Sequence, residues 1–303
     1  QTAIPSAIAA IFSIVYAIGN LFSGRFMDWI GTKKGYLWAI GIWSLGACMH
    51  AFSGVATVEW LGLEGKEDLI NAVGTSTAII ASVSAWFFII SRIVLGLGES
   101  GNFPCAIKVT AEYFPKKDRA LATSLFNAGS SVGALAAPLT IPILASKFGW
   151  EMAFIIIGAL GFLWMFFWVF LYSKPRESKY VNKAELEYIE QDKDDEPAPA
   201  ADGTERKLSF MECFKFKQTW AFAVGKFFTD GVWWFYLFWA PAYFSECGYG
   251  MDTTMGKMLV FVLYLIVTVL SIGGGYLPKL FVEKKGMEPY SGRMLAMLIF
   301  AFF

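Results

Sequence analysis

Two side chains of opposite charge lie within one strongly apolar stretch of the chain. Arg92 and Glu99 occur in AWFFIISRIVLGLGESGNFP, residues 85–104, which is long and apolar enough to cross a bilayer as a helix. An ion in hydrocarbon costs at least ~2.5–3.5 kcal/mol, so such residues usually face a water-filled cavity or each other. Their spacing puts both on one face of the helix, with a rise of roughly 10 Å between them.

The two residue types suit an anion site and a proton carrier. Arginine binds a carboxylate in two places and stays charged when buried. A glutamate can take up a proton, because removal from water favours the neutral carboxyl, whereas a nearby arginine favours the charged one. The pair therefore predicts a functional site; the alternative is that the two charges satisfy each other or brace helix packing.

The composition indicates an integral membrane protein. Hydrophobic residues make up 56% of the chain, charged residues 17%, and the mean hydropathy is +0.51. We expect an all-α fold of about eight membrane helices, the long third one either protruding from the bilayer or beginning with a separate turn. The expected spans are roughly 3–22, 35–54, 78–113, 120–141, 150–172, 219–244, 256–281 and a last one from 291 to 303.

Basic residues favour one set of loops. Of the 25 Lys and Arg residues, 20 fall on one side of the predicted membrane. The exceptions are Lys66, Lys147 and Lys257 on the other side, and Arg92 and Lys226 within spans. By the positive-inside rule, the basic side is cytoplasmic.

The composition also predicts three regions. Residues 1–172 would form an N-terminal bundle of five membrane helices, and residues 219–303 part of a C-terminal bundle with about three, the last one truncated. Residues 173–218 read as a charged cytoplasmic linker, in which KAELEYIEQD predicts a short amphipathic helix and DDEPAPAADGTE a flexible segment.

The loop GRFMDWIGTKK resembles the signature loop of the major facilitator superfamily. Its motif residues are Gly24, Asp28, Gly31, Lys33 and Lys34, which we expect to have gating or structural roles. The glycines permit a tight turn, Asp28 can accept from the N-terminus of a neighbouring helix, and the lysines can anchor to lipid phosphate.

Longer runs resemble the hexuronate transporters of the anion:cation symporter family within that superfamily. They are WSLGACMHAF, RIVLGLGESGNFPCAIKVTAEYFPKKDRALA, LFNAGSSVGALAAPL, GWEMAFIIIGALGFLW and QTWAFAVGKFFTDGVWWFYLFWAPAYF. The resemblance implies two pseudo-symmetric helical bundles and a proton-driven symporter of glucuronate or galacturonate, working by alternating access in the bacterial inner membrane. It also implies that the chain lacks the first helix and the last three, and so cannot transport as it stands.

The resemblance assigns roles to the ionisable pair. Residues matching Arg92 and Glu99 act in substrate binding and proton coupling, and substrate arriving on Arg92 would favour protonated Glu99. Galactonate-type relatives carry substrate-facing residues at the positions of Tyr16 and Ser130, but have Gln at the latter, which argues against a galactonate-type site. Near Thr268 the hexuronate branch tends to have an Asp, which leaves the second half of the site open.

Other polar and aromatic residues at membrane depth are weaker candidates. Asn127 either faces the cavity or bonds to a neighbouring helix, and Tyr236 could stack on a sugar ring and donate its hydroxyl. Lys226 and Asp230 have the spacing of an ion pair, with a structural or gating role. His50, the single histidine, could relay protons, but an interfacial structural role is favoured.

Glycines surround Glu99 in the spacing GxGxxG. Gly96, Gly98 and Gly101 lie inside a membrane helix, which excludes dinucleotide binding and favours close helix packing. The GxxxG pair Gly129 and Gly133 predicts the same.

Competing functions remain. The chain could carry another organic anion, such as galactonate, glucarate or phthalate, or act as a sensor on a transporter fold. An enzyme is not expected, because no nucleophile with a base and no metal cluster is visible among one histidine and four scattered cysteines. We expect no cofactor, metal or nucleic acid, and a monomer whose partners are a small organic anion, protons and the lipid bilayer.

Overall fold

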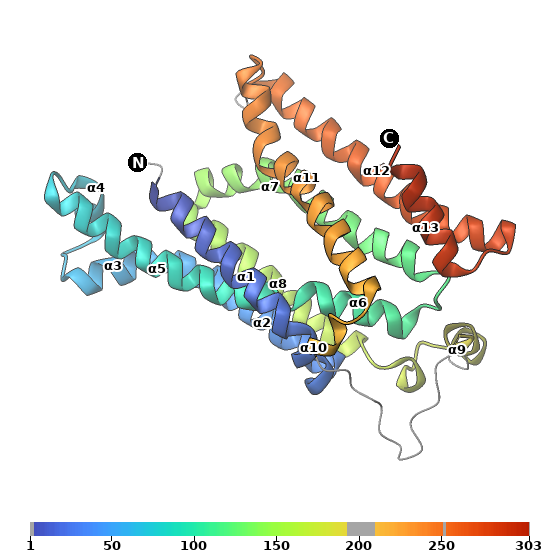
Figure 1. The fold of residues 1–303 in the computed structure, drawn as a ribbon. Helices are drawn as coiled ribbons and strands as arrows, with labels where there is room; N and C mark the ends of the chain where they lie inside the picture. Colours follow the sequence, from blue (N-terminus) through green and yellow to red (C-terminus); the bar gives the residue numbers. More distant parts are fainter. Residues whose placement is uncertain (1–2, 193–209, 251–252, 303) are drawn as a thin grey trace. The chain divides into compact units, whose positions relative to one another are not determined.

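The computed structural model describes residues 3–192, 210–250 and 253–302, and all regular elements among them are helices (Figure 1). This confirms the all-α prediction. In chain order the elements are α1 (Ala3–Ile30), α2 (Thr32–Ala51), α3 (Ser53–Leu61), α4 (Lys66–Asn71), α5 (Thr75–Glu99), α6 (Asn102–Tyr113), α7 (Arg119–Phe148), α8 (Trp150–Leu171), the 3₁₀ helix η1 (Pro175–Glu177), α9 (Lys183–Glu190), α10 (Phe210–Cys213), α11 (Lys217–Glu246), α12 (Thr254–Lys285) and α13 (Pro289–Phe300).

Five helical segments in the described residues are long and apolar enough to span a membrane. They are Ile4–Ile30, Thr75–Tyr113, Arg119–Ala137, Trp150–Leu171 and Thr254–Lys285, and the pair α2 and α3, bent by 55°, makes a sixth. The predicted span at 219–244 coincides with α11, which is long but does not reach the same apolarity. Its apolar character is aromatic, and Trp and Tyr favour the interface over the hydrocarbon centre.

The long third stretch is one extended span rather than a span preceded by a turn. Thr75–Tyr113 contains 39 residues, roughly 58 Å if straight, so its ends must protrude from a ~30 Å core. Its helical run is interrupted only at Ser100 and Gly101, directly after Glu99, where α5 gives way to α6.

The chain divides into two compact units. One comprises Gln1–Phe126 and Ala136–Ile189, and the other comprises Asn127–Leu135 and Glu190–Phe303. The division into bundles at 172 and 219 stays a prediction, and the segment DDEPAPAADGTE lies outside the described residues. The amphipathic helix predicted at KAELEYIEQD is present as α9.

In the first unit, glycines bring α2 against both α5 and α8. A Cβ at Gly98 would lie 2.2 Å from the backbone nitrogen of Trp43, and one at Gly46 would lie 2.5 Å from that of Leu95. On α8, a Cβ at Gly158 would meet the Cys48 sulfur at 2.4 Å. Only glycine allows backbones to approach this closely.

The packing role predicted for the glycines around Glu99 is confirmed. A Cβ at Gly96 would lie 3.3 Å from the Phe12 ring, and one at Gly101 would lie 2.8 Å from the Cβ of Ala39, which confirms close packing around Glu99. Cβ atoms at Gly129 and Gly133 would meet no described atom within 4 Å, so close packing at this GxxxG pair stays a prediction.

The second unit is built on α11, α12 and α13. Rings of Trp233 on α11 and Tyr264 on α12 meet edge to face with centroids 6.4 Å apart. The α12–α13 contact again uses glycine, because a Cβ at Gly274 would lie 3.3 Å from the Phe300 ring.

Candidate functional site

Arg92 lies on α5 against an aromatic residue of α1. Its guanidinium carbon is 5.7 Å from the centroid of the Phe12 ring, within range of a cation–π attraction. The side chain is half-buried, and its Nε is buried without a hydrogen-bond partner. Arg92 forms no salt bridge with a described residue, so its planar donor groups are not committed to a protein carboxylate.

Glu99 ends the same helix, two turns further on. Its carboxyl is half-buried, with the fully buried Ser100 beside it. The Glu99 and Arg92 charges act on each other through space, but no direct ion pair joins them in the described structure. The alternative that the two simply neutralise each other in a salt bridge therefore loses its support.

The helix α1 covers this face of α5. A Cβ at Gly19 would lie 2.5 Å from the Ser100 Oγ, so α1 passes close to the break that follows Glu99. One turn before Gly19, the half-buried Tyr16 stacks on Phe12, with ring centroids 6.0 Å apart and planes at 19°. The structure thus places Tyr16 next to the ring that supports Arg92.

The remaining predicted substrate residues belong to the other unit. Asn127 is half-buried, Ser130 is exposed, and the Tyr236 side chain is 48% exposed beside Phe235. Their part in binding stays a prediction.

The ion pair predicted between Lys226 and Asp230 is present. The Lys226 Nζ donates to Asp230 Oδ1 at 2.6 Å on α11; the Lys226 side chain is exposed and that of Asp230 is half-buried. Its gating role stays a prediction.

The signature loop differs in two details from its expected geometry. Gly31, with φ of 86°, makes the turn between α1 and α2, whereas Gly24 lies inside α1 and makes no turn. Asp28 is not bound to a helix N-terminus, because its Oδ1 accepts from Lys108 Nζ of α6 at 2.7 Å. The long, flexible Lys108 side chain can move to reach the Asp28 carboxylate, whereas the position of a helix N-terminus is fixed by the packing of the whole helix.

Near this loop, one carboxylate that sequence reasoning did not single out links three helices. Glu112, at the end of α6, accepts through Oε1 from the Thr32 hydroxyl at the start of α2, at 2.5 Å. Its Oε2 accepts from the hydroxyl of Tyr172, directly after α8. Burial and this hydrogen bond raise the pKa of Tyr172. In the sequence, Glu112 stands out only as a carboxylate near the end of a long apolar stretch, which gives no indication of its partners.

His50 is buried completely within the protein, in the last turn of α2, and its place at the membrane interface stays a prediction. Its Nδ1 contacts the Gly46 carbonyl at 2.7 Å, and its ring stacks on Phe154 at a centroid distance of 4.9 Å. Phe88 meets the same ring edge to face at 5.4 Å, and the Nε2 has no partner among the described residues. This aromatic enclosure favours the structural role over the relay.

No group of three or more metal-ligating side chains occurs among the described residues. The long apolar helices, the glycine-mediated packing and the charged side chains within apolar helices together define a multi-pass helical membrane protein.

The chain belongs to the Major Facilitator Superfamily, whose family model matches residues 3–303. It is 28% identical over 294 residues to the hexuronate transporter of Escherichia coli strain K12, which covers 97% of this chain. It is also 28% identical over 276 residues, or 91% of the chain, to the galacturonate transporter of Dickeya chrysanthemi, of which it covers 70%. A probable L-galactonate transporter of E. coli K12 is 26% identical over 96% of the chain, which covers 56% of that protein.

The chain spans only 60% of the length of the E. coli hexuronate transporter. Transport activity, substrate and coupling therefore belong to the proposal below.

Proposed function

We propose that this chain forms part of a secondary transporter that imports a hexuronate, glucuronate or galacturonate, together with a proton. The observation that carries the proposal is the state of Arg92 and Glu99: both lie at membrane depth on α5, and neither has a salt-bridge partner among the described residues. A half-buried guanidinium without a carboxylate is costly unless an anionic ligand completes it.

The surroundings of Arg92 suit a sugar acid. The substrate carboxylate would take the two parallel donors of the guanidinium. Phe12 restricts the Arg92 side chain from one side, and the adjacent Tyr16 offers an aromatic face and a hydroxyl suited to a sugar ring. Relatives whose names specify hexuronate and galacturonate transport support this substrate class.

Coupling would follow from the separation of the two charges. While the site is empty, burial would favour the neutral carboxyl of Glu99 and the Arg92 charge would favour the ionised one. A substrate carboxylate on Arg92 would cancel much of that attraction and favour protonation of Glu99, so the anion and the proton would travel together. Alternating access would then carry both across the membrane.

The membrane location is part of the same proposal. We place the protein in a bacterial inner membrane, with the segment from residue 173 to 218 in the cytoplasm, as the distribution of basic residues predicts.

Counterflow and accumulation assays on the full-length protein in proteoliposomes separate the two roles. We expect Glu99→Gln to abolish accumulation driven by a proton gradient while keeping exchange of labelled galacturonate. We expect Arg92→Ala to lose both, and Arg92→Lys to bind weakly, because lysine keeps the charge without the planar fork.

Glu59→Gln is the matched control, because Glu59 is an exposed carboxylate of α3; it should transport normally. The proposal fails if Glu99→Gln accumulates substrate as the unmodified protein does.

A second candidate is a carrier of another sugar acid. The similarity to the probable L-galactonate transporter favours it. Saturable uptake of labelled galactonate without competition by galacturonate would replace the hexuronate proposal. Binding of substrate without proton flux would instead indicate a sensor.

A further inference from the structure

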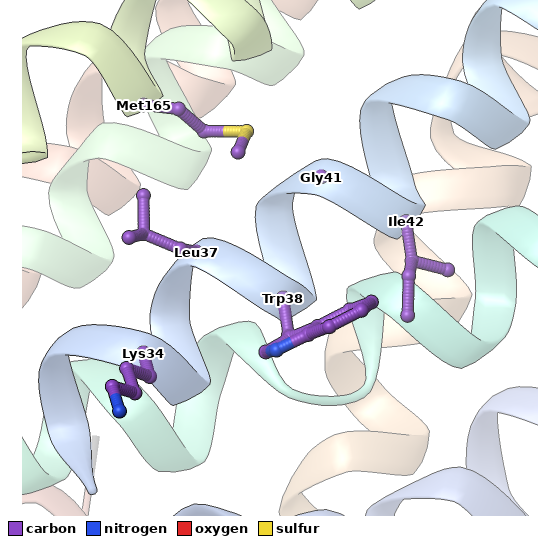
Figure 2. A pocket seen from close by; sticks show the side chains of 6 residues that line it. All are labelled: Lys34, Leu37, Trp38, Gly41, Ile42 and Met165. Carbon is purple, nitrogen blue, oxygen red and sulfur yellow. The ribbon is translucent and has the colours of Figure 1, made fainter. Parts of the chain in front are cut away.

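A hollow lies between α2 and α8 in the first unit, apart from the Arg92 site. It has a volume of about 350 Å³ and is lined by Lys34, Leu37, Trp38, Gly41, Ile42 and Met165. Figure 2 shows the α2 residues in a row along the length of that helix, with Lys34 at one end and Ile42 at the other, and Met165 approaching from α8. The row is roughly 12 Å long.

The absence of a side chain at Gly41 leaves room in the hollow. A Cβ there would lie 3.4 Å from the Met165 methyl carbon, so a larger side chain would enter the space lined by Met165. The exposed indole of Trp38, 57% accessible, forms part of the lining.

The helices on either side of the hollow are held in place. The Trp168 indole of α8 donates to the backbone carbonyl of Lys33 at 3.3 Å. Tyr36 packs against the stacked rings of Trp164 and Trp168, at centroid distances of 4.8 and 4.9 Å. These contacts fix α2 on α8, so the hollow is preformed and needs no ligand to open it.

Charge is confined to one end of the hollow. Lys34 carries the only charge among the six lining residues, is exposed, and forms no salt bridge with a described residue. Beyond Lys34 the lining is apolar as far as Ile42. A ligand that fits has a compact anionic group at one end and a flexible hydrocarbon chain.

We propose that this hollow binds an anionic phospholipid, with its phosphate on Lys34 and one acyl chain along Trp38, Gly41 and Met165. A phospholipid fits both the charged end and the apolar part of the hollow. Basic residues near the ends of membrane helices attract anionic headgroups, and tryptophan favours the headgroup boundary. A protein helix would have to bury Lys34 against an apolar surface, at the cost of an unpaired charge. The proposal does not depend on which substrate is transported.

Native mass spectrometry of the full-length protein tests the headgroup contact. After exchange into mixed micelles of phosphatidylglycerol and phosphatidylethanolamine, we expect phosphatidylglycerol to be retained preferentially. Lys34→Gln should reduce that retention about fivefold, the effect of one basic residue near an anionic membrane surface.

Lys33→Gln is the matched control, because Lys33 is adjacent in sequence but does not line the hollow. Equal effects of the two substitutions would show that Lys34 attracts lipid only as a non-specific surface charge, and would overturn the proposal. Equal retention of the two lipids by the unmodified protein would do the same.

A fluorescence experiment tests the acyl chain without requiring a bulky substitution. Phosphatidylglycerol brominated on its acyl chains should quench tryptophan emission in nanodiscs, and Trp38→Phe should remove a larger part of that quenching than Trp29→Phe does. Trp29 is even more exposed, at 80%, but lies on α1 outside the hollow. The reverse order, or equal losses, would show that no chain occupies the groove.

Gly41→Leu provides the steric test. It should lower phosphatidylglycerol retention while leaving Lys34 in place. Unchanged retention by a variant that melts at the temperature of the unmodified protein would contradict the assignment.

Discussion

At the scale of single residues, the contacts around a charged group in the first unit determine whether it can still bind a ligand. Arg92 lies over one ring and has no salt-bridge partner in the described parts of the chain, whereas Glu112 accepts from two hydroxyls. Arg92 therefore keeps hydrogen-bond donors for a ligand, whereas the Glu112 carboxylate uses both oxygens to link α6 to α2 and to the residue that follows α8. Residues with the same formal charge therefore serve different purposes within one unit.

His50 provides a test at this scale. Because its ring lies between Phe154 and Phe88, we expect His50→Phe to keep proton-driven uptake and its pH dependence. His50→Ala should lower stability by about 2–4 kcal/mol, since it leaves a cavity in a packed site. Uptake assays across a pH series, together with melting in detergent, check both expectations. A proton relay at His50 would instead appear as an altered pH profile in His50→Phe.

At the scale of elements, the position of α5 depends on glycines. Gly98 and Gly46 let α5 and α2 touch backbone to backbone, close to the helical break after Glu99. Such contacts fix the helix that carries Arg92 and Glu99, and they tolerate no added atoms.

We therefore expect Gly98→Ala to destabilise the protein by about 1–3 kcal/mol, because its Cβ would fall within 2.2 Å of a backbone nitrogen. Gly129→Ala is the matched control. Its Cβ meets no described atom within 4 Å, so it should be neutral or slightly stabilising. Thermal melting of both variants in one detergent measures the difference, and equal melting temperatures would contradict the close approach.

The Tyr188 side chain of the short helix α9 contacts the segment between α6 and α7. The Tyr188 hydroxyl donates to Asp118 Oδ2 at 2.6 Å, and the Lys117 Nζ lies 4.6 Å from the centroid of the Tyr188 ring. The hydrogen bond to the Asp118 carboxylate raises the pKa of Tyr188. The protonated hydroxyl is the form that stabilises this attachment.

The contact made by the Tyr188 hydroxyl depends on pH. Because the folded pKa of Tyr188 lies above the ordinary value of ~10, the stabilisation is complete below that pH and is lost as pH rises through the folded value. We expect Tyr188→Phe to increase hydrogen exchange in residues 183–190 at neutral pH severalfold, as loss of about 1 kcal/mol implies. Unchanged exchange would show that Ile189, which is buried, attaches α9 by itself.

At the scale of the whole molecule, the predicted orientation in the membrane depends on which loops lie on the same side. The Lys66 ammonium and the Glu151 carboxylate, which the sequence places on the same side, form a salt bridge at 2.8 Å. That contact agrees with the predicted alternation of loops, whereas the cytoplasmic side itself rests on the basic-residue distribution.

Cysteine labelling in intact cells tests the orientation. In a cysteine-free background, we expect Glu67→Cys to react with a membrane-impermeant maleimide and Lys179→Cys to react only after permeabilisation. Both positions are exposed, so access alone does not distinguish them. The opposite labelling pattern would invert the topology and the direction of transport.

Much of this molecule follows from periodicity and composition. Hydropathy and length identify helices long enough to span a bilayer, and the helical repeat puts Arg92 and Glu99 on one face of α5. The spacing of Lys226 and Asp230 likewise predicts their ion pair, because residues four apart on a helix are neighbours whatever surrounds them. These properties are local, so the sequence by itself determines them.

Partners from other helices were decided only by the tertiary structure. Sequence spacing could not show that Phe12 would lie beneath Arg92, that Asp28 would pair with Lys108, or that His50 would be fully buried. It also treated Gly98 and Gly129 alike, although only Gly98 meets a neighbouring backbone. The reason is physical: a helix presents every residue of its surface at a known angle, but which of those surfaces is covered depends on how side chains of different helices fit together.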